Sequence, residues 1–344
     1  MIRFACDYLE GTHQKILERL IETNMKQTCG YGLDPHCDRA RTLIKEACEC
    51  PTADVHFLVG GTQTNTTVIS SILRPYQGVI SAHTGHINVH ETGAIEATGH
   101  KVLSIFSETG KLSATQVEQM YLDHYNNGSA EHMVQPGMVY ISNPTENGTI
   151  YYKKELEQLS SICKKYNLPL FLDGARLGYG LCAPDNDLTL ADIARLCDVF
   201  YIGGTKVGAL FGEAVVITND TLKKDFRYFI KQNGGMLAKG RLLGIQFETL
   251  FEDGLYFEIS KHAIDLAMKV KECLEKNGYD VLIPSTTNQQ FPILEDSVLE
   301  TLSEKYAFEY WERKDETHSV IRICTSWATK EENIDELLKD LQKK

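Results

Sequence analysis

The sequence predicts an α/β protein in which a large domain with a mostly parallel sheet is followed by a small α+β domain. Short apolar runs rich in β-branched and aromatic residues recur over the first two thirds of the chain, with amphipathic helical patterns between several of them. Such alternation is typical of a parallel sheet covered by helices. After residue 255 the pattern changes to one long amphipathic helix and shorter strands.

Seven apolar runs are the expected strands of the large sheet, at residues 55–59, 79–81, 101–105, 138–142, 170–173, 199–202 and 214–217. Two of the intervening segments carry apolar side chains at helical spacing, which predicts helices over residues 66–73 and 153–166. Both helices are amphipathic, so one face of each is expected to pack on the sheet.

The small domain is expected to begin with a helix whose apolar residues run from Ile259 to Leu274. A strand is expected over residues 319–324. Thr329 and Glu332 have the spacing of a capping box, which predicts that the last helix starts there. Its buried stripe would consist of Ile334, Leu337, Leu338 and Leu341.

Composition argues against several classes of partner. The 344 residues are 42% hydrophobic and 24% charged, which suits a globular protein of more than one domain. A net charge of −12 without any basic run argues against nucleic acid and anionic membranes. No run of about 18 apolar residues is present, so no membrane span is expected. No secretion signal is recognised and the ten cysteines are scattered, which indicates reduced thiols in the cytoplasm.

Lys206 is the only charged residue between Val199 and Gly212. A buried lysine without a partner is costly, and its pKa falls toward neutrality. A neutral lysine amine can attack a carbonyl and form a Schiff base, so this position suits a nucleophile. The alternative is a lysine at a strand end whose amine reaches water.

Asp173 ends the apolar run 170–173, and Arg176 follows three residues later. Ligands of open α/β sheets bind beyond the carboxyl ends of the strands. A carboxylate at the tip of a buried strand needs a partner. Arg176 is one candidate for that partner, and the cationic nitrogen of a ligand is the other.

Two further segments carry polar groups at expected strand ends. In "FLVGGTQTN" a strand runs through Gly61 and Thr62 into a helix, whose free amides favour an anion. The segment 81–100 holds four histidines, but their spacing is not that of HExxH. "CEC" at 48–50 lacks a second close cysteine pair, so we expect no metal at either place.

These features together match the needs of pyridoxal phosphate. This cofactor needs a lysine for its aldehyde, an anion site for its phosphate, a carboxylate for its pyridine nitrogen and a flat group for its ring. Lys206, the turn at Gly61, Asp173 and a histidine of the segment 81–100 are the candidates.

The chain resembles the threonine aldolase and β-eliminating lyase family of pyridoxal phosphate enzymes. The motifs that carry the resemblance are "GYGLDP" (30–35), "GGTQTN" (60–65), "HINVHETGA" (86–94), "LDGAR" (172–176), "GGTKVG" (203–208) and "VIRICTSWAT" (320–329). The resemblance implies the aspartate aminotransferase-type fold (fold type I), with a three-layer α/β/α large domain around a seven-stranded sheet. The large domain would span residues 1–250 and the small one 251–344, with residues 1–30 packed on the small domain or on a neighbouring subunit.

The resemblance also implies a role for each matching residue. Lys206 would hold the cofactor, Asp173 would contact its pyridine nitrogen, and His86 would stack on its ring. Gly61, Thr62 and Thr205 would bind the phosphate. Tyr31 would reach the site of a second subunit, so a homo-oligomer is expected, either a dimer or a dimer of dimers. The arginines that would lie near the substrate carboxylate are Arg176, which is also close to the cofactor, and Arg322, whose alternative is a surface ion pair.

Two segments depart from the family pattern. Many members carry a histidine near the substrate hydroxyl, where this chain reads "SNPTENGTIYY", with Thr145 and Glu146. The base that takes the hydroxyl proton is therefore open between His86, Glu146 and a water. The arginine expected to reach the neighbouring phosphate falls in "GGMLAKGR", where Lys239 or Arg241 could replace it.

The resemblance implies a carbon–carbon lyase that cleaves a β-hydroxy-α-amino acid, such as threonine, allo-threonine or a phenylserine, to glycine and an aldehyde. The alternatives are β-elimination from an aromatic or cysteine-like amino acid, transamination, a non-catalytic homologue that binds the cofactor, and a histidine-bound metalloprotein. Retention of both Lys206 and Asp173 argues against a non-catalytic homologue.

Overall fold

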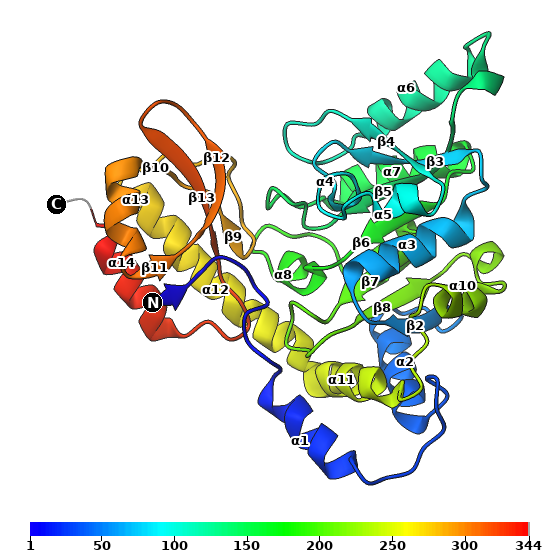
Figure 1. The fold of residues 1–344 in the computed structure, drawn as a ribbon, viewed down its shortest axis with the longest axis horizontal. Coiled ribbons are helices and arrows are strands. Elements are labelled where there is room, and N and C mark those ends of the chain that lie inside the picture. Colours follow the sequence, from blue (N-terminus) through cyan, green and yellow to red (C-terminus); the bar gives the residue numbers. More distant parts are fainter. Residues whose placement is uncertain (343–344) are drawn as a thin grey trace.

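The computed structural model describes residues 1–342 and contains two domains (Figure 1). The last two residues of the expected small domain, 343–344, lie outside the described residues. The large domain is built on a seven-stranded sheet with the order β2-β8-β7-β6-β5-β3-β4. Only β8 runs antiparallel to its neighbours in this sheet. The strands are β2 (Asp54–Leu58), β3 (Gln77–Ala82), β4 (Lys101–Ile105), β5 (Gln135–Ser142), β6 (Leu170–Asp173), β7 (Val199–Gly203) and β8 (Glu213–Ile217). All seven predicted runs are strands, and the predicted fold class is confirmed.

Helices cover both faces of this sheet because successive strand residues point to opposite sides. On β6, for example, Phe171 packs against one apolar cluster while Leu170 and Leu172 pack against the other. The helices over the Phe171 face are α3 (Gly61–Ile72), α4 (His86–Val89), α5 (Ala94–Ala97) and α10 (Phe226–Gln232). Those over the other face are α2 (Pro35–Ala47), α6 (Ala114–Tyr125), α7 (Lys153–Lys165), α8 (Leu177–Leu181), α9 (Leu190–Leu196) and α11 (Arg241–Phe251).

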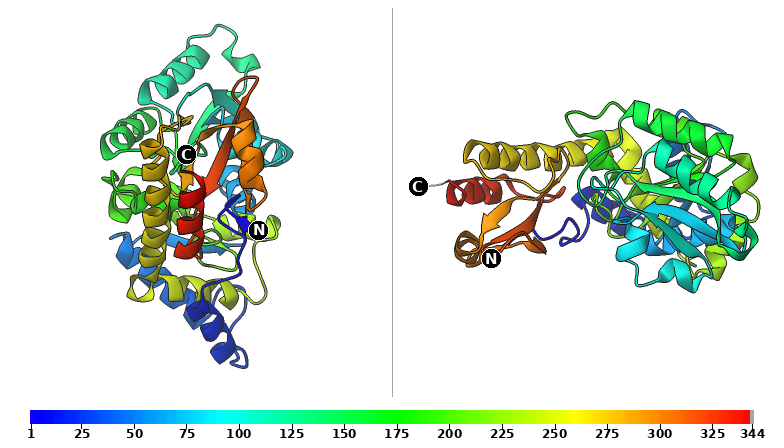
Figure 2. Two further views of the ribbon diagram at one scale, coloured as in Figure 1. Left: turned by 90° about the vertical axis from the view of Figure 1, so that its left-hand side faces the viewer. Right: turned by 90° about the horizontal axis from the view of Figure 1, so that it is seen from above.

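The small domain lies beside the large one, and α12 (Leu255–Lys276) runs from the large domain along it (Figures 1 and 2). Its antiparallel sheet has the order β10-β13-β12, and β9 also pairs with β13. The elements are β9 (Gln289–Gln290), β10 (Ile293–Glu295), α13 (Asp296–Ser303), β11 (Tyr306–Ala307), β12 (Glu309–Arg313), β13 (His318–Cys324) and α14 (Glu331–Asp340). None of the described helices is long and apolar enough to cross a membrane.

The N-terminal segment contacts both domains. Strand β1 (Ile2–Arg3) pairs with β11 of the small domain, whereas helix α1 (Gln14–Thr23) packs on α11 of the large domain. Three short 3₁₀ turns complete the described elements, at Ala130–His132, Asp220–Leu222 and Glu252–Gly254.

The predicted start of the last helix is wrong by one residue, because its N-cap is Lys330 and not Thr329. Helix α14 begins at Glu331, and its N-cap residue Lys330 provides no side-chain cap. The Thr329 hydroxyl instead accepts a hydrogen bond from the amide of Ser326 at 2.8 Å. A local turn therefore uses the hydroxyl that a capping box would need. The apolar stripe of the helix is buried as predicted at Ile334, Leu337 and Leu341.

The turns after β6 and β7 approach each other at two glycines. A Cβ atom on Gly174 would lie 1.9 Å from the carbonyl oxygen of Tyr201, and one on Gly203 would lie 2.2 Å from that of Ala175. The amide of Gly203 donates to the carbonyl of Gly174 at 2.9 Å. Only glycine permits this approach, because backbone atoms occupy the place of each side chain. The chain segments after the two strands are thereby brought together.

We expect Gly174→Ala to destabilise the protein by at least about 1–3 kcal/mol, because the new methyl group overlaps backbone that cannot rotate away. Gly128→Ala is the matched control, since its Cβ would meet no atom within 4 Å. Urea unfolding followed by circular dichroism measures both variants. Equal stability of the two variants would show that the turns after β6 and β7 can move apart without loss of stability.

Candidate active site

A cavity of about 580 Å³ opens at the carboxyl ends of β5, β6 and β7, between the two domains. Every residue that the sequence placed in the site lines it except Tyr31; they are Gly61, Thr62, His86, Glu146, Asp173, Arg176, Thr205, Lys206 and Arg322. The cavity therefore combines an amine, carboxylates, an imidazole and guanidinium groups from distant parts of the sequence.

Asp173 is 4% exposed and accepts four hydrogen bonds. Its Oδ1 accepts from the Tyr201 hydroxyl at 2.5 Å and from the Ala175 amide at 3.0 Å. Its Oδ2 accepts from the Tyr140 hydroxyl at 2.6 Å and from Asn65 Nδ2 at 3.2 Å. Arg176 contributes none of them, so the interpretation of an Asp173–Arg176 pair is wrong. The four donors hold the carboxylate in one orientation at the edge of the cavity.

Lys206 lies in the turn after β7, and its amine faces the Tyr8 ring, with 5.9 Å from Nζ to the ring centroid. Burial, assisted by the positive charge of Arg176, lowers its pKa below the ordinary value. The proposed strand-end lysine with a freely hydrated amine does not fit this setting. A lysine with a depressed pKa can act as a nucleophile near neutral pH.

Glu213 begins β8 next to the lysine turn. Its side chain accepts from the Gly204 amide at 3.1 Å and from the Thr205 hydroxyl at 2.8 Å. The Thr205 hydroxyl in turn accepts from the Gly212 amide at 3.0 Å. Burial raises the pKa of Glu213 to about 8, although Thr205 and Lys206 favour its ionised form. Glu213 and Thr205 thus fix the backbone that carries Lys206, and the phosphate role of Thr205 stays a prediction.

Helix α3 presents an uncapped N-terminus to the cavity. Its N-cap residue Gly60 makes no side-chain cap, and Gly61 and Thr62 line the cavity. The first amides of a helix attract anions through their free N–H groups and the helix dipole. This end of the cavity suits a phosphate group.

His86 belongs to a buried polar chain that leads to Asp173. Its Nδ1 lies 2.7 Å from Glu91 Oε1, and Asn65 Nδ2 donates to the same oxygen at 2.7 Å. Burial alone would lower the pKa of His86, but the Glu91 hydrogen bond and the charge of Asp173 raise it above the ordinary value. The imidazole is therefore oriented by Glu91 and favours its protonated form.

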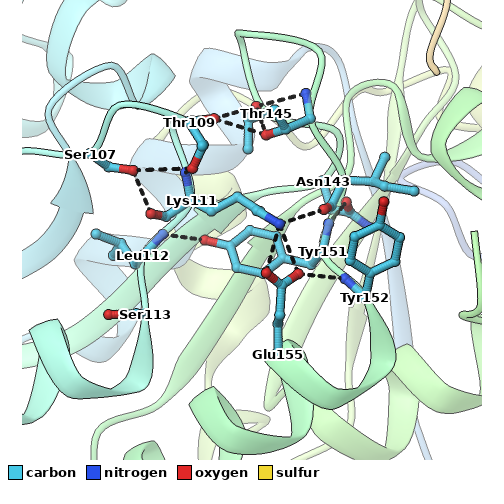
Figure 3. A network of polar contacts seen from close by, with 12 residues as sticks. Ser107, Thr109, Lys111, Leu112, Ser113, Asn143, Thr145, Tyr151, Tyr152 and Glu155 are labelled. Atoms are coloured by element: carbon cyan, nitrogen blue, oxygen red, sulfur yellow. Dashed lines mark hydrogen bonds and ion pairs between the residues drawn. The ribbon is translucent and has the colours of Figure 1, made fainter. Parts of the chain in front are cut away.

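Glu146 lies in the loop after β5. Its Oε1 accepts from the His86 amide at 3.0 Å and from the Ser142 hydroxyl at 2.7 Å. Burial, with the charge of Asp173, raises its pKa. The loop is held from behind by Lys111, whose Nζ contacts the Ile150 carbonyl and both oxygens of Glu155 (Figure 3).

The Arg176 guanidinium is paired with Asp7 of the N-terminal segment. Arg176 Nε lies 2.7 Å from Asp7 Oδ2, and Nη2 lies 3.0 Å from Oδ1. Burial opposes ionisation of Asp7, but Arg176 and Lys206 together lower its pKa to about 2. Asn288 of the small domain also donates to Asp7 at 2.9 Å. Arg176 lines the cavity, yet two of its nitrogens are already occupied.

Arg322 enters the cavity from β13 of the small domain. Its Nη2 donates to the Ala5 carbonyl at 2.8 Å, and its Nη1 donates to Gln289 Oε1 at 3.3 Å. Its guanidinium carbon lies 5.7 Å from the centroid of the Trp311 ring. Within residues 1–342 the buried Nε of Arg322 has no hydrogen-bond partner, and the side chain forms no ion pair. The surface ion pair considered from the sequence is therefore wrong. An unpaired buried donor of this kind suits an anionic ligand.

Tyr31 and Arg241 lie away from this cavity. Tyr31 is 47% exposed and lies under the ammonium of Lys231, on a surface shared with Tyr228 and Met236. The Arg241 guanidinium donates to three carbonyls at the end of α1, those of Thr23, Asn24 and Lys26. The predicted role of Tyr31 in the site of a second subunit stays a prediction.

The four histidines of the segment 81–100 have separate environments. His83 Nδ1 accepts from the Ser107 amide at 3.1 Å, and His100 lies by the Gln77 carbonyl, whereas His86 and His90 line the cavity. Within residues 1–342, no group of three or more side chains suited to a metal ion is found.

Sequence reasoning missed several residues that shape the site: Asp7, Tyr8, Asn65, His90, Glu91, Tyr140, Tyr201 and Glu213. Asn65, His90 and Glu91 lie within motifs that were noticed, so their polar character was a usable signal. Tyr140 and Tyr201 lie inside apolar strands and carry no local signal. Their role follows only from the pairing of β5 and β7 with β6.

The residues present fit pyridoxal phosphate. The buried amine of Lys206, the fixed carboxylate of Asp173 and the imidazole of His86 share one cavity with the uncapped end of α3. These are the four kinds of group that the cofactor requires.

Comparison with known proteins identifies the class of enzyme to which this fold and cavity belong. The β-eliminating lyase family profile matches residues 4–297, and the chain belongs to this family. A low specificity L-threonine aldolase from Pseudomonas sp. is 30% identical over 99% of this chain and 97% of its own length. A structure of Leishmania major threonine aldolase is 50% identical, with a TM-score of 0.96 over 99% of this chain and 98% of that chain. The fold also matches a Thermus thermophilus aspartate aminotransferase double mutant, with a TM-score of 0.72 at 14% identity over 99% of this chain and 90% of that chain.

We expect Glu213→Gln to remove a pH-dependent loss of stability. The folded pKa of about 8 exceeds the ordinary 4.5, so the folded protein binds more protons at this site than the unfolded chain does. Glu213 therefore lowers the free energy of unfolding progressively as the pH rises from about 4.5 to 8. Urea unfolding at pH 5, 6.5 and 8 should show a smaller decline in the variant. If the free energy of unfolding declines equally with pH in both proteins, Glu213 is ionised in the folded protein over this whole pH range.

Proposed function

We propose that this protein cleaves a β-hydroxy-α-amino acid, such as threonine, allo-threonine or a phenylserine, to glycine and an aldehyde, with pyridoxal phosphate as its cofactor. The observation that carries the proposal is the cavity in which the low-pKa amine of Lys206 and the fixed carboxylate of Asp173 meet. The threonine aldolases that match over nearly the whole chain support the same substrate class.

The cofactor, when bound, accepts the electron pair of the bond broken at the α-carbon. In this proposal Lys206 holds the cofactor covalently, Gly61 and Thr62 bind its phosphate, and Asp173 holds a proton on its ring nitrogen. His86, oriented by Glu91, lies against its ring. Preorganised charge of this kind is the main contribution that a protein makes to such a reaction.

The substrate carboxylate is proposed to bind between the two domains. Arg322 offers its unpaired Nε, and Arg176 offers the nitrogen that Asp7 leaves free. When Arg322 and Arg176 both hold the carboxylate, the Cα–Cβ bond of the substrate is oriented for cleavage.

We also propose a cytoplasmic homo-oligomer. All ten cysteines are free, which fits a reducing compartment. The exposed surface formed by Tyr31, Tyr228, Lys231 and Met236 is a suitable contact for a second copy, which would bring Tyr31 to the neighbouring cavity.

A panel of β-hydroxy-amino acids, scored for glycine and aldehyde, tests the reaction. Lys206→Ala should lose turnover while it keeps the fold, because no other lysine among residues 1–342 lines the cavity. Borohydride reduction of the wild type should attach the cofactor to the peptide that contains residue 206. Cysteine assayed in parallel for pyruvate distinguishes β-elimination. Pyruvate without glycine, or labelling of another lysine, contradicts the proposal.

Arg322→Lys is expected to raise KM strongly and to lower kcat, because an ammonium group cannot hold a carboxylate with two parallel hydrogen bonds. Cofactor absorbance should stay normal, since Arg322 lies far from the α3 N-terminus in the chain and belongs to the other domain. Steady-state kinetics with an amino acid and with its amide measure the effect. An unchanged preference for the acid over the amide would place the carboxylate elsewhere.

A further inference from the structure

We propose that His90 is the general base that takes the proton of the substrate β-hydroxyl, an inference that rests on the proposed function. His90 directly follows α4 and lines the cavity, one helical turn beyond His86. The two imidazole rings lie on the same side of this turn, with 5.6 Å between their centroids. A group held beside the ring that covers the cofactor can reach the substrate atoms on that side.

The other basic groups of the cavity are already engaged. Asp173 is assigned to the ring nitrogen of the cofactor and accepts four hydrogen bonds, and His86 Nδ1 is paired with Glu91. Glu146 Oε1 accepts hydrogen bonds from the His86 amide and the Ser142 hydroxyl, and burial raises the pKa of this carboxyl. Glu213 holds the backbone of the lysine turn. Glu309 lies opposite Arg322 in the β12–β13 register, where the carboxylate of the substrate is expected.

His90 is free to act. Within residues 1–342, no hydrogen bond to its ring nitrogens is formed, and its side chain is exposed toward the cavity. Burial of part of the ring lowers its pKa below the ordinary value, assisted by the positive charges of His86, Arg322, Lys206 and Arg176. The ring is therefore neutral near pH 7 and able to accept a proton. The other titratable groups that line the cavity are Tyr8, Glu146, Asp173, Tyr201, Glu213 and Glu309.

The step balances without a further reactant. The hydroxyl proton passes to a ring nitrogen of His90, the Cα–Cβ bond breaks, and the carbon–oxygen bond of the leaving fragment becomes the aldehyde double bond. The electron pair stays with the α-carbon fragment, which becomes glycine when it gains a proton. His90 then returns its proton to solvent, so no proton is gained or lost overall.

The test separates the hydroxyl step from the rest of the site. His90→Ala should lower kcat for threonine or phenylserine cleavage about 10²-fold to 10⁴-fold, the usual contribution of a general base. Exchange of the glycine α-proton with deuterated water involves no hydroxyl, so it should stay within about threefold of wild type if the general base acts only on that group. Added imidazole should restore part of the cleavage rate, because the vacated position opens to the cavity. Val89→Ala is the matched control on the same turn, exposed and outside the cavity lining.

Two further readouts do not depend on turnover rate alone. In histidine NMR of the protein with and without cofactor, the signal lost in His90→Ala should titrate below the ordinary pKa of 6.5. The kcat/KM of the wild type should rise with pH through that same pKa, and this limb should vanish in the variant.

Each outcome has a distinct meaning. Absence of glycine release by the wild type refutes the proposed function itself. If the wild type cleaves and His90→Ala cleaves equally well, His90 is not the base. Loss of cleavage in Glu146→Gln, with His90→Ala near wild type and no imidazole effect, would assign the base to Glu146 and overturn the inference. If His90→Ala loses both glycine exchange and cleavage, His90 has a structural role instead.

Discussion

The site depends on the contact between the turns that follow β6 and β7. Asp173 and Lys206 are 33 positions apart in the sequence, and they share a cavity because the backbone of Gly174 meets that of Gly203. This contact requires two residues without side chains at one point. A parallel sheet brings strand ends together in any case, but only this approach places both functional groups at the same edge with little freedom.

A second constraint links the domains through a buried charge. Asp7 contacts Arg176 of the large domain and Asn288 of the small one, while the strand before it pairs with β11. Removing one partner of such a pair would leave an uncompensated charge, which costs about 3–5 kcal/mol. The N-terminal segment is thus part of the cavity wall, with Tyr8 facing the Lys206 amine. The Asp7–Arg176 pair therefore couples the position of the small domain to the charge at this side of the cavity.

Much of this arrangement follows from the sequence, and the remainder depends on tertiary contacts. Apolar runs identify all seven strands, and in the five inner strands burial on both faces leaves few polar residues. Lys206 and Asp173 stand out for the same reason, as single charges beside apolar segments. Tyr140 and Tyr201 resemble their apolar neighbours, and only strand pairing reveals that both hydroxyls reach Asp173. The pairing of Arg176 with Asp7 joins residues 169 positions apart, and no local pattern predicts it.

The cavity controls protonation by giving each titratable group a different neighbour. Burial lowers the pKa of Lys206 and raises that of Glu146, which shifts both groups toward their neutral forms. Glu91 has the opposite effect on His86, whose protonated form it stabilises. The environment therefore shifts the pKa of each group in its own direction, which is how one site supplies acids and bases at the same pH. These pKa shifts arise from residues on several different strands, helices and loops. The chemistry of the cavity is therefore a property of the assembled fold.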